Sequence, residues 1–349
     1  NTAIFAEFSI PVLETLELQL AVRHEDYSDF GTTTDPKVAF RWSPFDELVV
    51  RGSWGTAFRA PSLVQLHLGR TDESPSVIDK ERCRQTGAEV DCEPTEYTAI
   101  VAGNKNLQPE ESENFNLGVV WEATDNFSIG VDYWNYDQEN LIKKIGAQKL
   151  VDCCGSDSSL VVRAPNQGST LGRILQINDT FVNIGGRETD GFDINLEYKL
   201  MTDNLVEFKF NYNLTYALNF EEQAFESDDA GNRINVIDDR NGEYQHPELR
   251  WTSGVDWNRD DWVATLSVSH IGSYKDLPDS NNDKFGIDSW TTIDTSVSYV
   301  GFEGLVLTAG AANLLNEEAP QAPSESMGVD NKTHSSLGRQ AYLKFNYKF

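Results

Sequence analysis

The sequence predicts an all-β protein, specifically an antiparallel up-and-down transmembrane β-barrel, with about 13 strands in this chain. Three observations predict this fold. Apolar and polar residues alternate along most of the chain, short and long connections alternate between the predicted strands, and aromatic residues lie beside the short connections. A period of two places one face of each strand in an apolar medium and the other face in a polar space.

The period of two is strongest in residues 339–349 and in residues 205–218. Both segments have aliphatic or aromatic side chains at every second position and mostly polar side chains between them. Such alternation is typical of a strand with one face in lipid and the other in water. The segments that we predict as strands are 3–10, 14–27, 35–42, 47–58, 112–121, 126–138, 181–200, 205–220, 248–258, 262–274, 289–299, 305–316 and 338–349.

The connections between these segments alternate between short and long. The short ones are 11–13, 43–46, 122–125, 201–204, 259–261 and 300–304. The long ones are 28–34, 59–111, 139–180, 221–247, 275–288 and 317–337. An up-and-down barrel has short periplasmic turns and long extracellular loops, so this order favours a barrel over a Greek-key sandwich.

Aromatic residues of the predicted outward face lie beside the short connections. Indole and phenyl rings prefer the membrane interface, where one end of the side chain is wet and the other is apolar. We therefore predict an aromatic belt at the periplasmic boundary of the membrane. Its residues are Trp42, Trp121, Phe127, Trp257 and Trp262.

The composition restricts the possible functions of this 349-residue chain. Mean hydropathy is negative, and no run approaches the roughly 18 apolar residues of a membrane helix. The formal net charge is −28, with acidic residues concentrated in the long connections, which argues against binding to nucleic acid or to anionic lipid surfaces. No G-x-S-x-G or H-E-x-x-H motif is present, so an enzyme is the poorest interpretation.

The four cysteines form two local groups. Cys83 and Cys92 lie in one polar, turn-rich connection, and their spacing predicts a disulfide in an oxidising compartment. Cys153 and Cys154 are adjacent, so a bond between them would be strained. Two free thiols, or pairing with the other connection, remain alternatives for this second group.

The strand count also predicts that this chain is part of a larger barrel. Thirteen is odd, whereas bacterial single-chain barrels close with an even number of strands. An open sheet in lipid would leave backbone groups without hydrogen bonds at its edges. Because the first residue is Asn1 and no signal-like segment precedes the first strand, we expect a processed or truncated N-terminus.

Several segments resemble one family. The sequence GTAFRAPSLVQL at 55–66 resembles the "G-x-x-FRAPS-x-x-E/Q-L" strand-to-loop signature of TonB-dependent outer-membrane receptors. Further segments resemble that family in the same order: NLQPEESENFNLG at 106–118, FSIGVDYWNY at 127–136, TDGFD at 189–193 with Asp193 where Glu is usual, and ANLLN at 312–316. The terminal strand also resembles those of outer-membrane barrels, whose last aromatics are recognised by the barrel-assembly machinery. That resemblance assigns an insertion signal to Phe345, Tyr347 and Phe349.

The resemblance implies a 22-stranded barrel that encloses a plug, with a TonB box before the plug. Residues 1–349 are then expected to be the C-terminal portion of the barrel, without plug or box. The implied function is active import of a scarce nutrient, with energy from the TonB complex, through a barrel inserted in outer-membrane lipid. The acid-rich loops favour a neutral oligosaccharide or a peptide over an anionic ferric siderophore. The alternatives are a passive porin and a structural barrel.

Candidate ligand contacts come from the inward parity of one strand and from the family signature. Asp132, Trp134 and Tyr136 are expected on the lumen side of their strand, where aromatic rings can stack on flat ligands, although packing against a plug explains them equally well. Arg59 begins a long connection just before Pro61. We favour a structural role for Arg59 over a ligand contact.

The acidic loops suggest a possible calcium site as the only cofactor. Asp279, Asn281 and Asp283 place oxygen ligands at alternate positions, as in a calcium loop. The turn glycine and the bidentate glutamate of such a loop are missing, however, because Lys284 and Trp290 occupy those positions. Asp228 and Asp229 are a second candidate pair. Solvated acidic loops are the simpler interpretation of both groups.

Overall fold

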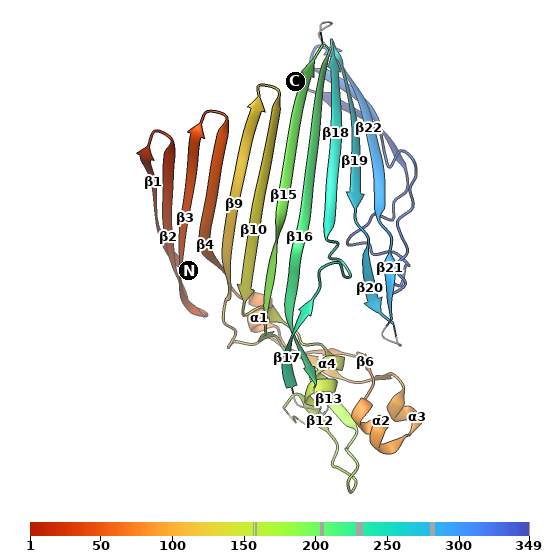
Figure 1. Cartoon of the computed structure of the whole chain (residues 1–349). Helices are drawn as coiled ribbons and strands as arrows, with labels where there is room; N and C mark the ends of the chain where they lie inside the picture. The colour runs from red at the N-terminus through yellow and green to blue at the C-terminus, as the bar shows by residue number, and fades with distance from the viewer. Residues whose placement is uncertain (156, 158, 203–205, 228–232, 280–282, 349) are drawn as a thin grey trace.

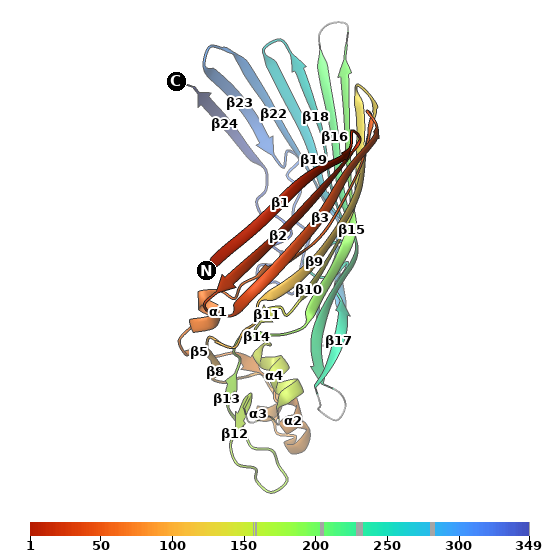
Figure 2. The same cartoon turned by 90° about the vertical axis from the view of Figure 1, so that its left-hand side faces the viewer.

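A computed structural model of the chain describes residues 1–155, 157, 159–202, 206–227, 233–279 and 283–348. Its main feature is one large antiparallel sheet that curves through space, as Figures 1 and 2 show from two directions. Within the described ranges, no helix is long and apolar enough to cross a membrane. The all-β, antiparallel fold predicted from the alternation is confirmed.

The strands of the sheet follow one another in chain order, each antiparallel to the one before, which is the up-and-down arrangement. In the described part of the chain all thirteen predicted strands are present, and β17 (Arg233–Asp239) adds a partner to β16. The thirteen are β1 (Thr2–Leu13), β2 (Leu16–Tyr27), β3 (Gly31–Phe45), β4 (Leu48–Arg59), β9 (Glu110–Thr124), β10 (Phe127–Glu139), β15 (Gly186–Met201), β16 (Glu207–Ser227), β18 (Leu249–Arg259), β19 (Trp262–Ile271), β22 (Trp290–Phe302), β23 (Leu305–Ala312) and β24 (Gln340–Tyr347).

The connection between β2 and β3 is shorter than predicted. The expected long loop over residues 28–34 is a turn of residues 28–30, because the strands pair as far as Tyr27 and Gly31. Gly31 has a φ of +100°, a conformation that residues with a Cβ avoid, and the ring of Phe30 stacks on Tyr27 with centroids 4.5 Å apart. The predicted alternation of short and long connections is therefore wrong at this position.

Two long connections, residues 60–109 and 140–185, form a folded unit beyond the ends of the strands, which we call the outer lobe (Figure 1). It contains short helices that the sequence pattern did not predict. Its elements are α1 (Leu63–His67), β5 (Thr71–Glu73), β6 (Ser76–Val77), α2 (Lys80–Thr86), α3 (Glu89–Cys92), β7 (Thr95–Glu96), β8 (Ala99–Val101), β11 (Ile142–Lys143), α4 (Ala147–Cys154), β12 (Val161–Arg163), β13 (Ile174–Asn178) and β14 (Val182–Asn183).

The outer lobe has its own apolar core. Helix α4 packs its Leu150 and Val151 against Val161 on β12 and Ile177 on β13. Strands β12, β13, β8 and β5 form a small sheet in which β13 and β8 run parallel. Because residues from both long connections share this core, the two connections fold together rather than as separate loops.

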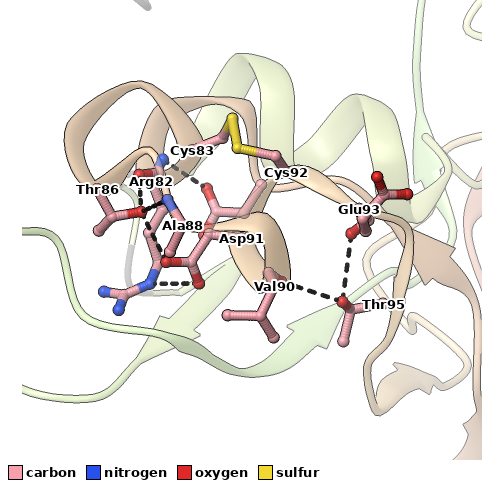
Figure 3. Close-up of a disulfide and its surroundings, with 10 residues drawn as sticks. Arg82, Cys83, Thr86, Ala88, Val90, Asp91, Cys92, Glu93 and Thr95 are labelled. Carbon is pink, nitrogen blue, oxygen red and sulfur yellow. Dashed lines mark hydrogen bonds and ion pairs between the residues drawn. A yellow bond between two sulfur atoms is a disulfide. The ribbon is translucent and has the colours of Figure 1, made fainter.

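Two disulfides lie in the outer lobe. Cys83 on α2 and Cys92 on α3 are bonded, with the sulfur atoms 2.02 Å apart (Figure 3). Next to this bond, Arg82 Nε donates to Asp91 Oδ1 over 2.9 Å. Cys153 and Cys154 at the end of α4 are bonded to each other, which resolves the pairing that the sequence left open.

A buried ion pair joins the two connections of the lobe. Arg163 on β12 donates from Nη2 to Oδ1 of Asp79, the residue that caps the N-terminus of α2, over 3.1 Å. Its Nε also donates to the carbonyl oxygen of Gly155 over 2.8 Å. Only 8% of the Arg163 side chain and 1% of the Asp79 side chain are exposed, so each charge depends on the other for compensation.

The family-like segments at 55–66 and 106–118 meet where the sheet joins the outer lobe. Arg59 at the end of β4 forms an ion pair with Glu110 at the start of β9. The same carboxylate accepts a hydrogen bond from the backbone N–H of Ile142 over 2.7 Å. Leu66 and Leu107 pack against Ile142 in a small buried cluster. These contacts connect the two strands to β11 at the base of the lobe.

Strands β20 (Tyr274–Pro278) and β21 (Lys284–Ile287) form a separate hairpin in the connection between β19 and β22. Tyr274 and Ile287 of this hairpin pack on Ala322 of the connection between β23 and β24. The long connections at this end of the sheet therefore contact one another. The hairpin and the outer lobe both lie at the end of the sheet opposite the short turns (Figure 1).

Candidate functional site

The two faces of the sheet differ in chemistry. We call the face that carries Trp42, Trp121, Phe127, Trp257 and Trp262 the outer face, and the opposite one the inner face. These five aromatics lie near the short-turn ends of β3, β9, β10, β18 and β19, where Phe127 pairs with Tyr198, and Trp257 with Phe208. About half of the Trp121 side chain is exposed, at 50%. Such exposure is costly in water and favourable at a membrane interface.

A second row of rings crosses the outer face six positions further along the strands, for example from Trp121 to Phe115. Its members contact one another: Tyr133 lies 6.3 Å from Phe115 and 5.3 Å from Phe192 between ring centroids. Trp251 and His270 also contact each other, with their rings stacked and their centroids 5.1 Å apart, whereas the two contacts of Tyr133 are tilted. Six residues of strand span about 20 Å along the strand, and the outer face between the two rows is the part that we assign to lipid. The aromatic belt predicted from the sequence did not include this second row.

On the inner face, Asp132 is bound by an arginine two strands away. Arg51 on β4 donates from Nη2 to Asp132 Oδ2 over 2.8 Å and from Nε to Oδ1 over 3.1 Å. The pair crosses Gly118 on β9, where an added Cβ would lie 2.0 Å from Asp132 Oδ1. The Asp132 residue is 7% exposed. This pair gives Asp132 a structural role on the inner face, and a ligand contact by Asp132 stays a prediction.

Trp134 and Tyr136, the other two candidates on β10, lie together above Asp132. Their ring centroids are 5.9 Å apart. The indole of Trp134 lies over Gly191 on β15, where an added Cβ would approach its Cζ2 to 2.7 Å. The glycine therefore provides the space that the indole occupies.

Trp134 lines a pocket of about 250 Å³ at the long-connection end of the inner face. Strands β10, β15, β16 and β18 form its floor, and residues 241–248 form its rim. The pocket combines aromatic rings, hydroxyls and a cation. The side chains that give it this chemistry are Trp134, Thr189, Thr215, Phe220, His246 and Arg250, and the carboxylate of Glu248 also belongs to the lining.

An aromatic and cationic stack borders the pocket. The His246 ring stacks on Phe220 with centroids 4.0 Å apart, and the Arg187 guanidinium lies 5.2 Å from the Phe220 centroid on β16. Arg187 also pairs with Glu222, which accepts a second hydrogen bond from Lys143 of the lobe over 2.7 Å. Burial would raise the pKa of Glu222, but the hydrogen bonds from Lys143 and Arg187 outweigh it and lower the pKa to about 2.

Phe220, His246 and Arg250 were not predicted as site residues. Counting every second residue along β16 places Phe220 with Phe208 and Phe210 on the outer face. The pairing of β15 with β16 skips one residue of β16. Gly191 pairs with Ala217, but the preceding residue, Asp190, pairs with Asn219, which leaves Leu218 without a partner in the register. This bulge at Leu218 moves Phe220 to the inner face. Nothing in the local sequence marks the bulge.

Arg59 is not among the residues that line this pocket, and its ion pair with Glu110 agrees with the structural role that we favoured. Of the predicted insertion signal, Phe345 and Tyr347 lie on β24, where they are 70% and 60% exposed. Phe349 lies outside the described residues. Recognition of these residues by the barrel-assembly machinery stays a prediction.

The two described residues of the predicted calcium loop have another role. Asp279 Oδ1 accepts a hydrogen bond from Asp283 N over 2.9 Å, and Asp279 N donates to Asp283 O over 2.9 Å. These bonds close the hairpin between β20 and β21. Asn281, Asp228 and Asp229 lie outside the described residues. Among the described residues, no group of three or more His, Cys, Asp or Glu side chains is arranged to hold a metal ion, and the calcium site stays a prediction.

Comparisons with known proteins agree on the fold. The ferric enterobactin receptor PirA of Pseudomonas aeruginosa is 24% identical over 99% of this chain and 41% of its own length. The vitamin B12 transporter BtuB of Vibrio cholerae is 22% identical over 100% of this chain and 42% of its own length. The chain thus spans about two fifths of the length of these curated relatives.

Solved structures show the same arrangement of strands. The ferric enterobactin receptor PfeA of P. aeruginosa, in complex with enterobactin, matches with a TM-score of 0.68 at 19% identity, over 99% of this chain and 45% of that one. The siderophore receptor PirA of Acinetobacter baumannii matches with a TM-score of 0.67 at 17% identity, over 99% of this chain and 45% of that one. At these identities the likeness shows the fold alone.

The family model described as "TonB dependent receptor-like, beta-barrel" matches residues 1–314. Members of this family are β-barrels of the Gram-negative outer membrane, which agrees with the two rows of rings on the outer face. The chain therefore belongs to the β-barrel family of the TonB-dependent receptors of the outer membrane.

Proposed function

We propose that this chain forms the C-terminal wall of an outer-membrane receptor that binds a scarce nutrient at its long-connection end and imports it actively. The TonB complex supplies the energy, through a plug and a TonB box that belong to other parts of the full-length protein. Family membership supports this proposal, as does the coverage of only 41% and 42% of the named relatives. The barrel-assembly machinery and outer-membrane lipid are the other partners that we propose.

The observation that carries the proposal is the inner-face pocket, whose lining includes Trp134, His246 and Arg250. A pocket lined by both an aromatic ring and a cation suits a flat, electron-rich ligand, because the ring stacks and the cation offsets negative charge. The pocket lies at the end of the sheet where a ligand arriving from outside the cell would enter. It has no arrangement of nucleophile and base, and we assign it no catalytic role.

For the substrate we propose a bulky metal chelate of the ferric siderophore type. The acid-rich loops favoured a neutral oligosaccharide or peptide, but the pocket lining has a cation, Arg250, together with one carboxylate, Glu248, and Arg187 at its border is paired with Glu222. The names of the relatives support a chelate as well, since one is a ferric enterobactin receptor and another a vitamin B12 transporter.

The test uses ferric enterobactin and vitamin B12 as probes with cells that produce the full-length protein. We expect saturable uptake of one probe, and we expect the Trp134→Ala variant to bind that probe about tenfold more weakly, the effect of losing about 1.4 kcal/mol of contact energy. Trp54→Ala is the matched control, because Trp54 pairs with Phe115 of the outer-face row and lies outside the pocket.

Deletion of TonB separates the alternatives. Uptake that stops without TonB supports active transport, whereas uptake that continues shows a passive porin. If neither probe binds, a metal chelate of these types is not the substrate. Equal loss of binding in the Trp134→Ala and Trp54→Ala variants would contradict the proposal that the inner-face pocket binds the ligand.

A further inference from the structure

Three long connections, residues 240–248, the described residues of 272–289 (272–279 and 283–289) and residues 313–339, pack into one unit that we call the outer-loop cluster. The second of them contains the β20–β21 hairpin, and the third joins β23 to β24. Side-chain contacts link all three. They are Tyr244 with Glu325, Lys284 with Glu243, Tyr274 with Asp330 over 2.8 Å, and Ser324 N with Asp276 Oδ2 over 2.9 Å.

His334 lies inside this cluster and is 4% exposed. Its ring stacks on Tyr274 of β20, with centroids 5.7 Å apart and planes 11° apart. It also meets Trp290 of β22 edge-on at 5.5 Å. The imidazole therefore lies between the hairpin and the first residue of β22. Through these contacts it anchors its own connection, residues 313–339, to both strands.

Neither ring nitrogen of His334 has a hydrogen-bond partner among the described residues, and the same holds for Nε1 of Trp290. The contacts that the ring does make are stacking contacts, which depend on its aromatic surface. A protonated ring would add a charge and a second N–H donor to this apolar contact. Without partners, that form is much less compatible with the packed cluster than the neutral form.

The charged and titratable groups around His334 come from several elements. β20 contributes Tyr274, the ring's own connection contributes Asp330, and β18 contributes Arg250. β22 contributes Trp290, which does not titrate. Asp330 is fully buried and attracts a protonated imidazole, but it already accepts the hydroxyl of Tyr274 and the backbone N–H of Lys332.

Burial lowers the pKa of His334, Asp330 raises it and Arg250 lowers it, with a net decrease. A histidine whose folded-state pKa is depressed stabilises the packed state above its ordinary value of about 6.5. That stability is lost as the pH falls below this value, because the opened state binds a proton that the packed state excludes. The packed cluster is therefore expected to open in acid.

We propose that His334 stabilises the outer-loop cluster in a pH-dependent way. When its ring is neutral, His334 holds residues 313–339 against β20 and β22, and when the ring is protonated, these residues are released. This device goes beyond the proposed import function, since it concerns the state of the loops with no ligand bound. It makes the long-connection end of the receptor more open in acid than at neutral pH.

Hydrogen–deuterium exchange of the full-length protein in lipid nanodiscs tests this device. Exchange is compared between about pH 7.5 and about pH 5, which bracket the ordinary histidine value, and corrected for the intrinsic chemical rate. Peptides from 272–289 and 313–339 report the opening of the cluster. We expect the opening constant measured from their exchange to increase by up to about tenfold per pH unit below about 6.5. Peptides from residues 60–109 of the outer lobe should show no such increase.

Three variants test whether the pH dependence of exchange comes from His334. His334→Phe keeps a stacking ring without a titratable group and should remove the pH dependence, and His334→Gln is the second choice if the phenylalanine variant does not fold. His246→Phe is the matched control, because His246 lies in the same cluster but stacks on Phe220. A pH dependence that persists in the His334 variants, or that disappears in His246→Phe, overturns the proposal. The proposal is also overturned if exchange in the wild-type protein does not increase at low pH. That result would be decisive even if both His334 variants fail to fold.

Discussion

Replacing Arg51 with alanine should destabilise the folded barrel by about 1.5–3 kcal/mol, the range for hydrogen bonds to a charged group, because solvent at the half-exposed Arg51 screens part of the attraction. The reason is the environment of Asp132, whose side chain is 10% exposed whereas that of Arg51 is 50% exposed. Without Arg51 the carboxylate stays on the inner face with its two charged hydrogen bonds lost. Denaturant titration of the full-length protein in lipid vesicles measures the change in the free energy of unfolding.

A double-mutant cycle provides the control for this prediction. Asp132→Ala should cost less than Arg51→Ala, because it leaves the more exposed partner behind. The double variant should be more stable than the sum of the two single changes predicts, since no uncompensated charge remains. Additive effects of the two substitutions would show that the pair is not coupled, and would contradict the role given to Asp132.

Replacing Val119 with arginine should cost about 2–4 kcal/mol, the range for a cation placed at the midplane of the bilayer on the lipid face of a barrel. Val119 lies on β9 between Phe115 of one aromatic row and Trp121 of the other, and it is 41% exposed. An arginine there has no polar partner within the part of the outer face that we assign to lipid. The fraction of protein that folds into vesicles, followed by its mobility on a gel without heating, measures the effect.

The neighbouring residue is the matched control. Val120 pairs with Gly130 on the inner face, so an arginine at position 120 would point away from lipid. We expect Val120→Arg to fold with a loss well below that of Val119→Arg. Equal losses at the two positions, or a larger loss at 120, would mean that the outer face does not contact lipid.

The strands could be predicted because each carries its own alternation, and this local pattern is what a lipid-facing strand requires. Even here the pattern failed at one point: the bulge at Leu218 inverts the faces of β16, so that Phe220 joins the pocket. An extra residue in one strand is visible only when its pairing with the neighbour is known.

The candidate site could be predicted only in part, because its residues come together through pairing across the sheet. Parity along β10 alone placed Trp134 on the inner face, where it lines the pocket, whereas Tyr136 is not among the lining residues. The Arg51–Asp132 pair joins residues 81 positions apart, and neither residue type distinguishes a ligand contact from an ion pair. The outer lobe was missed for a different reason: its helices are short, and α4, with 8 residues, is too short to show a helical period.

Spin-label accessibility along β16 tests the central claim most directly, namely that this sheet separates lipid from a polar lumen. Single nitroxide labels at residues 210–215 would be exposed in turn to oxygen, which concentrates in lipid, and to a water-soluble nickel chelate. The account predicts high oxygen accessibility at Phe210, Tyr212 and Leu214 and high nickel accessibility at Asn211, Asn213 and Thr215. Nickel accessibility at all six positions would contradict it, because both faces of the sheet would then lie in water.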